Sequence, residues 1–182
     1  KTPSNWVISC IAQRKKTEYL YIGMFVYCID RYYPKTNIIK HYTKGNAPTQ
    51  LNNEAVYAIL EDSKGNIWMG TNGWGVNVLD PNTGIIKKYV VDPNNPGALV
   101  GNYVRCFYED HSGNIWTGTT TGVSVFDPAA KTITRFDPNN TKWESDVIFS
   151  MYEDQKGTMV IGSQGGGRIK LDQGTKKLTR YT

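Results

Sequence analysis

Short apolar segments alternate with turns rich in Gly and Asp along the whole chain. Residues 55–60 and 66–69, for example, are largely apolar segments on either side of the turn Asp62-Ser-Lys-Gly. Short apolar segments bounded by turn residues are typical of β-strands, and a tight turn between two of them predicts a hairpin. The chain is therefore predicted to be all-β.

This hairpin belongs to an internal repeat. The stretch Glu-Asp-Ser-Lys-Gly-Asn-Ile-Trp-Met-Gly-Thr at 61–71 returns at 109–119 and, in a more divergent form, at 153–163. Its second glycine recurs with a period of about 45 residues, which is typical of propellers and solenoids. The repeat predicts one domain, 1–182, made of four units at about 4–43, 51–90, 99–137 and 143–182.

Each unit holds four apolar segments, which predict four antiparallel strands. In the first of these segments the residues are apolar on both faces of the strand. Val56 and Ala58 would point to one face, and Tyr57 and Ile59 to the other. Because an antiparallel sheet usually leaves one face in water, this pattern indicates that both faces are covered. Four-stranded sheets stacked face to face form a β-propeller, so each unit is predicted to be one blade. Small side chains at one shared position indicate that the first strand is innermost: Ala58, Cys106, Ser150 and Ser9.

Composition argues against several partners and sites. The apolar content is 39%, but no apolar run approaches the roughly 18 residues of a membrane span, so this segment is not expected to contact a membrane. The formal net charge of +5 is not clustered, so nucleic acid is not an expected partner. Much of it lies on the last strand of each unit, where basic residues protect an outer edge against pairing. The three cysteines lack metal-ligand spacing and are expected to be buried thiols, and no metal or cofactor is predicted.

The repeat resembles a known family. Its pattern is Val-x-x-Ile-x-Glu-Asp-x-x-Gly-x-Ile-Trp-x-Gly-Thr-x-x-x-Gly-Val, followed by a strand that ends in Asp-Pro, and it resembles the two-component regulator propeller repeat. Residues 56–81 and 104–128 match it closely, whereas 148–172 has Val160 in place of Trp. Residues 7–34 diverge further, because they lack Glu-Asp and carry Cys28 near a usual Gly.

The resemblance implies a fold and a setting. Proteins of this family are large bacterial hybrid sensors, whose periplasmic part contains seven-bladed propellers followed by a membrane helix and a histidine kinase. It implies a non-enzymatic periplasmic segment that senses a carbohydrate, with a small molecule or oligosaccharide and the remaining blades of the parent propeller as partners. Four blades are expected to form an open arc of a larger seven-bladed ring, although a tight four-bladed ring is the alternative. The exposed blade faces of an arc would favour self-association.

The candidate ligand residues lie in the loops that vary between units, because function on a repeat scaffold usually sits there. Arg105 has no basic counterpart in the other units. Trp74 breaks the repeat, and it either stacks on a sugar ring or packs between blades. Asn5, Glu54, Asn102 and Asp146 share one register, either as turn acceptors or as a polar ring. The predicted ligand-binding residues are Arg105, Trp74, Asn72, Asn53, Asn102 and Tyr103.

Two other classes of function remain open. One is a propeller lyase that acts on a polysaccharide or lactone with a His and a metal ion. Against it, His41 and His111 are expected to lie away from the variable loops, without a nucleophile or metal partner. The other is a structural propeller whose loop surface binds a neighbouring protein domain. No catalytic residue is predicted.

Overall fold

The computed structural model describes residues 7–13, 18–25, 28–136, 147–165, 167–173 and 178–181. In these ranges the chain forms four antiparallel sheets, each of four strands in chain order. Blade 1 holds β1 (Ile8–Gln13), β2 (Leu20–Met24), β3 (Ile29–Tyr33) and β4 (Ile38–Tyr42). Blade 2 holds β5 (Val56–Glu61), β6 (Ile67–Thr71), β7 (Val76–Leu79) and β8 (Ile86–Tyr89). Blade 3 holds β9 (Val104–Glu109), β10 (Ile115–Thr119), β11 (Gly122–Asp127) and β12 (Thr132–Phe136). Blade 4 holds β13 (Ile148–Glu153), β14 (Thr158–Ser163), β15 (Gly167–Asp172) and β16 (Leu178–Tyr181).

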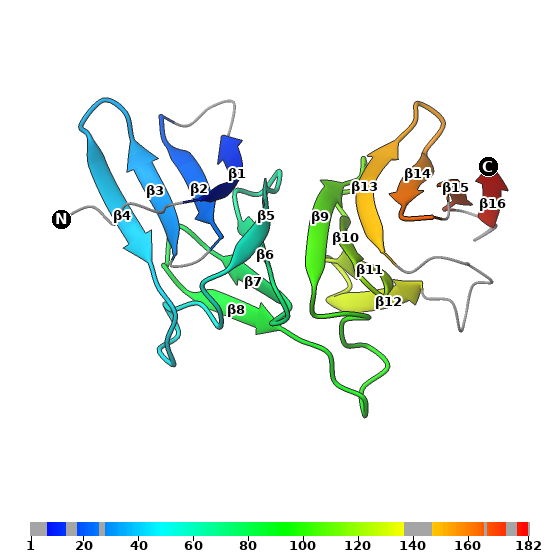
Figure 1. Cartoon of the computed structure of the whole chain (residues 1–182), viewed down its shortest axis with the longest axis horizontal. Coiled ribbons are helices and arrows are strands. Elements are labelled where there is room, and N and C mark those ends of the chain that lie inside the picture. The colour runs from blue at the N-terminus through cyan, green and yellow to red at the C-terminus, as the bar shows by residue number, and fades with distance from the viewer. Residues whose placement is uncertain are drawn as a thin grey trace.

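These sheets confirm the predicted all-β fold of four-stranded propeller blades. The first strand of each blade is the innermost, and the blades follow one another around the middle of the molecule (Figure 1). β1 packs on β5, β5 on β9, and β9 on β13, whereas β13 makes no comparable contact with β1 in the described residues. The blades therefore form an open arc. No helix in the described ranges is long and apolar enough to cross a membrane.

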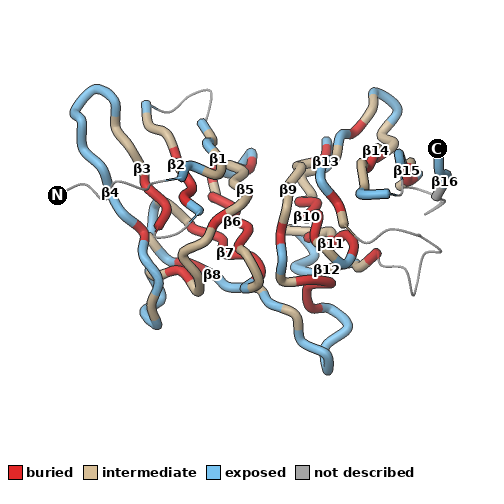
Figure 2. Tube along the Cα trace, viewed as in Figure 1, coloured by how far each residue is buried: buried red, intermediate tan, exposed pale blue. Residues whose placement is uncertain are grey.

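The blades are held together by apolar layers between neighbouring sheets. Successive side chains of a strand point to opposite faces of its sheet. Accordingly, Ile67 and Met69 face blade 1, while Trp68 between them faces blade 3. Trp116 likewise faces blade 4, where it joins the layer around Met159. The buried stretches concentrate in the middle strands of blades 2 and 3, and β4 at the edge is largely exposed (Figure 2).

The two acids of the repeat motif have different roles. Asp62 stabilises its own turn by accepting hydrogen bonds from the backbone N–H groups of Lys64 and Asn66 and from the indole of Trp68. Glu109 instead contacts the preceding blade, where it accepts the backbone N–H of Ser63 at 2.8 Å. Two adjacent acids at the start of a turn would be expected to cap it together, but only the Asp does this. The Glu joins neighbouring blades, as Glu153 does with the backbone N–H of His111.

The innermost strands share a β-bulge, which corrects one predicted alignment. In blade 1 Cys10, not Ser9, lies opposite the motif glycine Gly23, so Cys10 is the counterpart of Ala58, Cys106 and Ser150. The pairing register shifts just before this position in each blade. A bulge leaves one extra residue without a ladder partner and re-aims its side chain. The bulged residues are Ser9, Tyr57, Arg105 and Phe149.

The two end faces of the arc differ in chemistry. The outward face of blade 1 exposes the apolar side chain of Ile11, which lies opposite Ile22 and is 59% exposed, and farther out it carries the polar pair of Asp30 and His41. The outward face of blade 4 carries Arg168 and Lys170, and both contact the ring of Tyr181. In blade 3 the corresponding positions are occupied by Val123 and Val125, which face blade 4. The outward face of blade 4 is therefore polar where an inner blade is apolar.

Candidate functional site

Four of the six predicted ligand residues meet where the β6–β7 turn contacts the segment leading into β9. Asn72 forms an isolated antiparallel bridge with Tyr103, and the N–H of Gly75 donates to the carbonyl of Asn102 at 2.9 Å. Gly73 lies against the ring of Tyr103, which a Cβ at Gly73 would approach to 3.2 Å. Trp74 lies in the same turn. We call this group, Asn72, Trp74, Asn102 and Tyr103, the loop junction.

Trp74 and Tyr103 are exposed in the loop junction. Trp74 is 52% exposed and Tyr103 is 51% exposed, so neither ring is enclosed between blades. The Lys44 Nζ atom lies 5.9 Å from the centre of the Trp74 ring, within the range of a cation–π contact. The packing alternative for Trp74 is therefore wrong. Trp143, which aligns with Leu51 and Leu99 in the repeat and is therefore predicted to pack between blades, lies outside the described residues.

The two amide side chains of the adjoining loops support the loops themselves. Asn53 Oδ1 accepts the backbone N–H of Ala55 at 2.8 Å, and Asn102 Oδ1 accepts that of Val91 at 2.8 Å. These are the turn-acceptor roles that the sequence left open for Asn102. Asn5 and Asp146, which share its register, lie outside the described residues.

Arg105 is the bulged residue of β9 and lies two positions after Tyr103. Its guanidinium carbon lies 5.1 Å from the centre of the Tyr57 ring, and Tyr57 in turn packs on Phe25 at 5.0 Å between ring centres. Tyr57 is the bulged residue of β5, so the bulge brings equivalent positions of two innermost strands into contact. The Nε atom of Arg105 is buried without a hydrogen-bond partner in the described residues. Phe149, the bulged residue of β13, is exposed.

A separate cavity of about 1070 Å³ lies between blades 2 and 3 near their outer strands. Its apolar wall includes Trp68, Tyr89 and Phe126, whose rings pack on one another with centres 5.0 to 6.5 Å apart. Lys64 and Lys131 also line it. None of the six predicted ligand residues lines this cavity. The motif Trp68 thus packs between blades, and the repeat pattern carries no signal for a cavity beside it.

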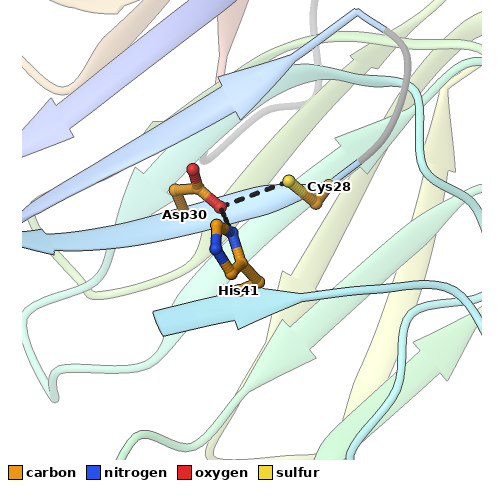
Figure 3. A group of neighbouring side chains, drawn as sticks. All are labelled: Cys28, Asp30 and His41. Carbon is orange, nitrogen blue, oxygen red and sulfur yellow. Dashed lines mark hydrogen bonds and ion pairs between the residues drawn. The ribbon is translucent and has the colours of Figure 1, made fainter. Parts of the chain in front are cut away.

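Three side chains of the types that ligate metal ions lie close together in blade 1. His41 Nδ1 is 2.6 Å from Asp30 Oδ1, and the thiol of Cys28 donates to the same oxygen at 3.2 Å (Figure 3). Burial, reinforced by the neighbouring Asp30 carboxylate, raises the pKa of Cys28 to about 12. Strand pairing sets His41 directly opposite Asp30, so potential metal ligands that the sequence did not indicate lie beside it. His111 contacts Glu153 in a turn, away from the loop junction.

Comparison with known proteins identifies the repeats. Residues 50–73 and 98–121 match the model of the two component regulator propeller family. No curated protein matches the chain. The chain is similar to the extracellular domain of a protein designated a hybrid two component system from B. thetaiotaomicron, with 25% identity and a TM-score of 0.74. That alignment covers 96% of this chain and 22% of the other.

Two further solved structures are similar in fold. The extracellular domain of another B. thetaiotaomicron protein, designated a one component system, is 19% identical with a TM-score of 0.54, and the alignment covers 99% of this chain and 30% of the other. Virginiamycin B lyase from Staphylococcus aureus is 17% identical with a TM-score of 0.69 over 96% of this chain and 55% of the lyase. The chain thus spans less than two thirds of each of these structures.

Proposed function

Blades 2 and 3 of this chain carry two-component regulator propeller repeats, and we propose that the chain is a non-enzymatic, ligand-sensing segment of a bacterial hybrid two-component sensor. The observation that carries this proposal is the similarity of nearly the whole chain to the extracellular domain of such a system. The segment acts outside the cytoplasm, in the periplasm. The remaining blades of the parent propeller and its histidine kinase belong to a longer protein.

We propose that the ligand is a carbohydrate and that it binds at the loop junction and Arg105. The rings of Trp74 and Tyr103 are half exposed, and such rings can pack against the apolar face of a pyranose. Pockets for small molecules combine apolar and aromatic surface with a few polar groups that set orientation. Arg105 and Asn72 supply those groups here. The guanidinium is held on the Tyr57 ring, so less conformational freedom is lost when it binds a sugar hydroxyl.

Isothermal titration calorimetry with a panel of neutral and acidic oligosaccharides tests this proposal. We expect saturable binding by the parent chain. Trp74→Ala and Arg105→Ala are each expected to lower the affinity at least tenfold, which corresponds to about 1.4 kcal/mol, because each change removes a direct contact. Tyr152→Ala is the matched control, since Tyr152 is an equally exposed aromatic residue on blade 4. Equal affinity in all variants, or an equal loss in the control, contradicts the assignment of this site.

The same panel separates the two alternatives. Release of a shortened product, abolished by a chelator, would make the chain a lyase and contradict the non-enzymatic proposal. Neither histidine of the chain belongs to the loop junction, because His41 contacts Asp30 and His111 contacts Glu153. Absence of any heat with the panel would favour a loop surface that binds a protein domain.

We further propose that the isolated chain self-associates through the outward face of blade 1. Exposed apolar patches on propeller blades favour association, and Ile11 is 59% exposed on this face. We expect the apparent mass in sedimentation experiments to rise with concentration, and Ile11→Lys to lower it. Tyr152→Lys on blade 4 serves as the control and is expected to leave association intact. A single monomeric species at all concentrations would contradict this proposal.

A further inference from the structure

Three potential metal ligands converge on the outward face of blade 1, in a group unrelated to the loop junction. One ligand atom from each of Cys28, Asp30 and His41 lies within 4.8 Å of the other two. Asp30 belongs to β3 and pairs directly with His41 of β4, and Cys28 lies two residues before Asp30. In Figure 3 the thiol and the imidazole both contact the same carboxylate oxygen of Asp30. Two paired strands of the scaffold therefore position the group.

All three residues depart from the repeat at their positions. Strand pairing makes Cys28 equivalent to Gly75, Gly122 and Gly167, which all have positive φ, and makes Asp30 equivalent to Asn77, Ser124 and Ile169. His41 replaces the basic residues Lys88, Arg135 and Arg180. Three independent substitutions in one blade thus fall within one small volume. Blade architecture does not require this combination, because the other blades form without it.

The equivalents of Asp30 show what that position ordinarily does. Asn77 Oδ1 accepts the backbone N–H of Asn52 at 3.0 Å, and Ser124 Oγ accepts that of Val100 at 2.9 Å. In those blades a neutral side chain anchors the loop that precedes the innermost strand. A carboxylate with a thiol and an imidazole beside it offers a donor set that loop anchoring does not need.

The donor set selects the chemical class of ion. Thiolate, imidazole and carboxylate together are typical ligands of Zn²⁺, whereas Ca²⁺ and Mg²⁺ prefer oxygen ligands alone. Bond lengths of about 2.0 to 2.3 Å put the ligand atoms of a tetrahedral zinc site on the order of 3.5 Å apart, so small side-chain rotations would suffice here. Asp30 is 2% exposed, while the His41 side chain is 52% exposed, so the site can be reached from solvent.

We propose that Cys28, Asp30 and His41 bind one zinc-class divalent cation, with three protein ligands and the fourth position available to water or to an added ligand. Binding would link β3 to β4 at the outward face of the first blade. The thiol releases its proton on binding, since the thiolate is the metal ligand. The proposal does not depend on the loop junction or on a carbohydrate ligand.

Titration of the reduced full chain with Co²⁺, followed by its absorption spectrum, tests the site. We expect a thiolate-to-cobalt charge-transfer band that saturates at one ion per chain and disappears when Zn²⁺ is added. Cys28→Ser and His41→Ala are each expected to weaken binding by more than about 100-fold, because loss of an outer hydrogen-bond partner alone costs 10- to 100-fold. Cys106→Ser is the matched control, and it should retain the band because Cys106 lies in the layer between blades 3 and 4.

Circular dichroism must first establish that each variant is folded. His41→Ala keeps the test decisive if Cys28→Ser does not fold, since the His41 side chain is half exposed. Absence of the band in the parent chain would overturn the proposal. Its persistence in a folded Cys28→Ser or His41→Ala chain, or its loss in folded Cys106→Ser, would overturn it equally.

Discussion

Replacing Asp110 with alanine is expected to lower the free energy of unfolding by about 3 kcal/mol, because buried donors that lose their acceptor cost about 1 to 3 kcal/mol each. Asp110 accepts four hydrogen bonds of 2.8 to 3.0 Å. Two come from the backbone N–H groups of Ser112 and Asn114, one from the Asn114 side chain and one from the Trp116 indole. Trp116 is 2% exposed, so water cannot replace the lost acceptor. Chemical denaturation followed by tryptophan fluorescence measures the change.

Asp154 offers a matched control for this substitution. It occupies the same motif position in blade 4, but within the described residues its side chain accepts only the backbone N–H groups of Lys156 and Thr158. Val160 stands where Trp116 stands in blade 3, so no indole N–H is left unpaired by Asp154→Ala. A clearly smaller loss of stability is expected. Equal losses for Asp110→Ala and Asp154→Ala would mean that the indole hydrogen bond is unimportant.

Gly70→Ala is expected to destabilise the chain by about 2 kcal/mol, in the range typical of overpacked cores. An added Cβ would lie 2.8 Å from Cβ of Val104 and 3.1 Å from the Phe107 ring, and closer still to Cγ1 of Val104. Both neighbours belong to β9 of the next blade. The substitution therefore forces blades 2 and 3 apart, and thermal unfolding measures the result.

The corresponding change in blade 4 should be tolerated. A Cβ at Gly162 would meet only Oγ of Ser150 at 2.6 Å, with the next atoms at 3.9 Å. Rotation of that hydroxyl relieves the contact, because no following blade packs on this face in the described chain. Gly162→Ala is therefore expected to change the melting temperature little. A loss as large as that of Gly70→Ala would indicate that another surface covers blade 4.

The repeat itself could be predicted because its signals are local. Glycines with positive φ, such as Gly65 and Gly113, mark the tight turns, and the apolar segments on either side mark the strands. These signals recur with one period, so strand number, strand order and the stacking of blades follow from the chain alone. Arg105 and Trp74 were likewise found as departures from the period, whereas the other candidate ligand residues were chosen by their place in or beside the variable loops. Arg105 was recognised in this way, although its contact with Tyr57 was not.

Contacts between strands and between blades could not be predicted from these local signals. A shift of one residue in strand pairing moves a side chain to the other face of the sheet. The bulge in β1 therefore decided that Cys10, and not Ser9, lies opposite Gly23. The reach of Glu109 to the preceding blade depends on how two sheets stack, which no local pattern encodes.

The group of Cys28, Asp30 and His41 shows the same division. Cys28 was visible in the chain as a departure from a repeat glycine, but nothing in the sequence singled out Asp30 or His41. The spacing of Cys28 and Asp30 is compatible with one face of an extended chain. Their meeting with His41 depends on the pairing of β3 with β4, which sets Asp30 opposite His41. Local residue types and periodicity thus determined the blades, whereas the register of hydrogen-bonded strands and the packing of neighbouring sheets decided which distant side chains share a site.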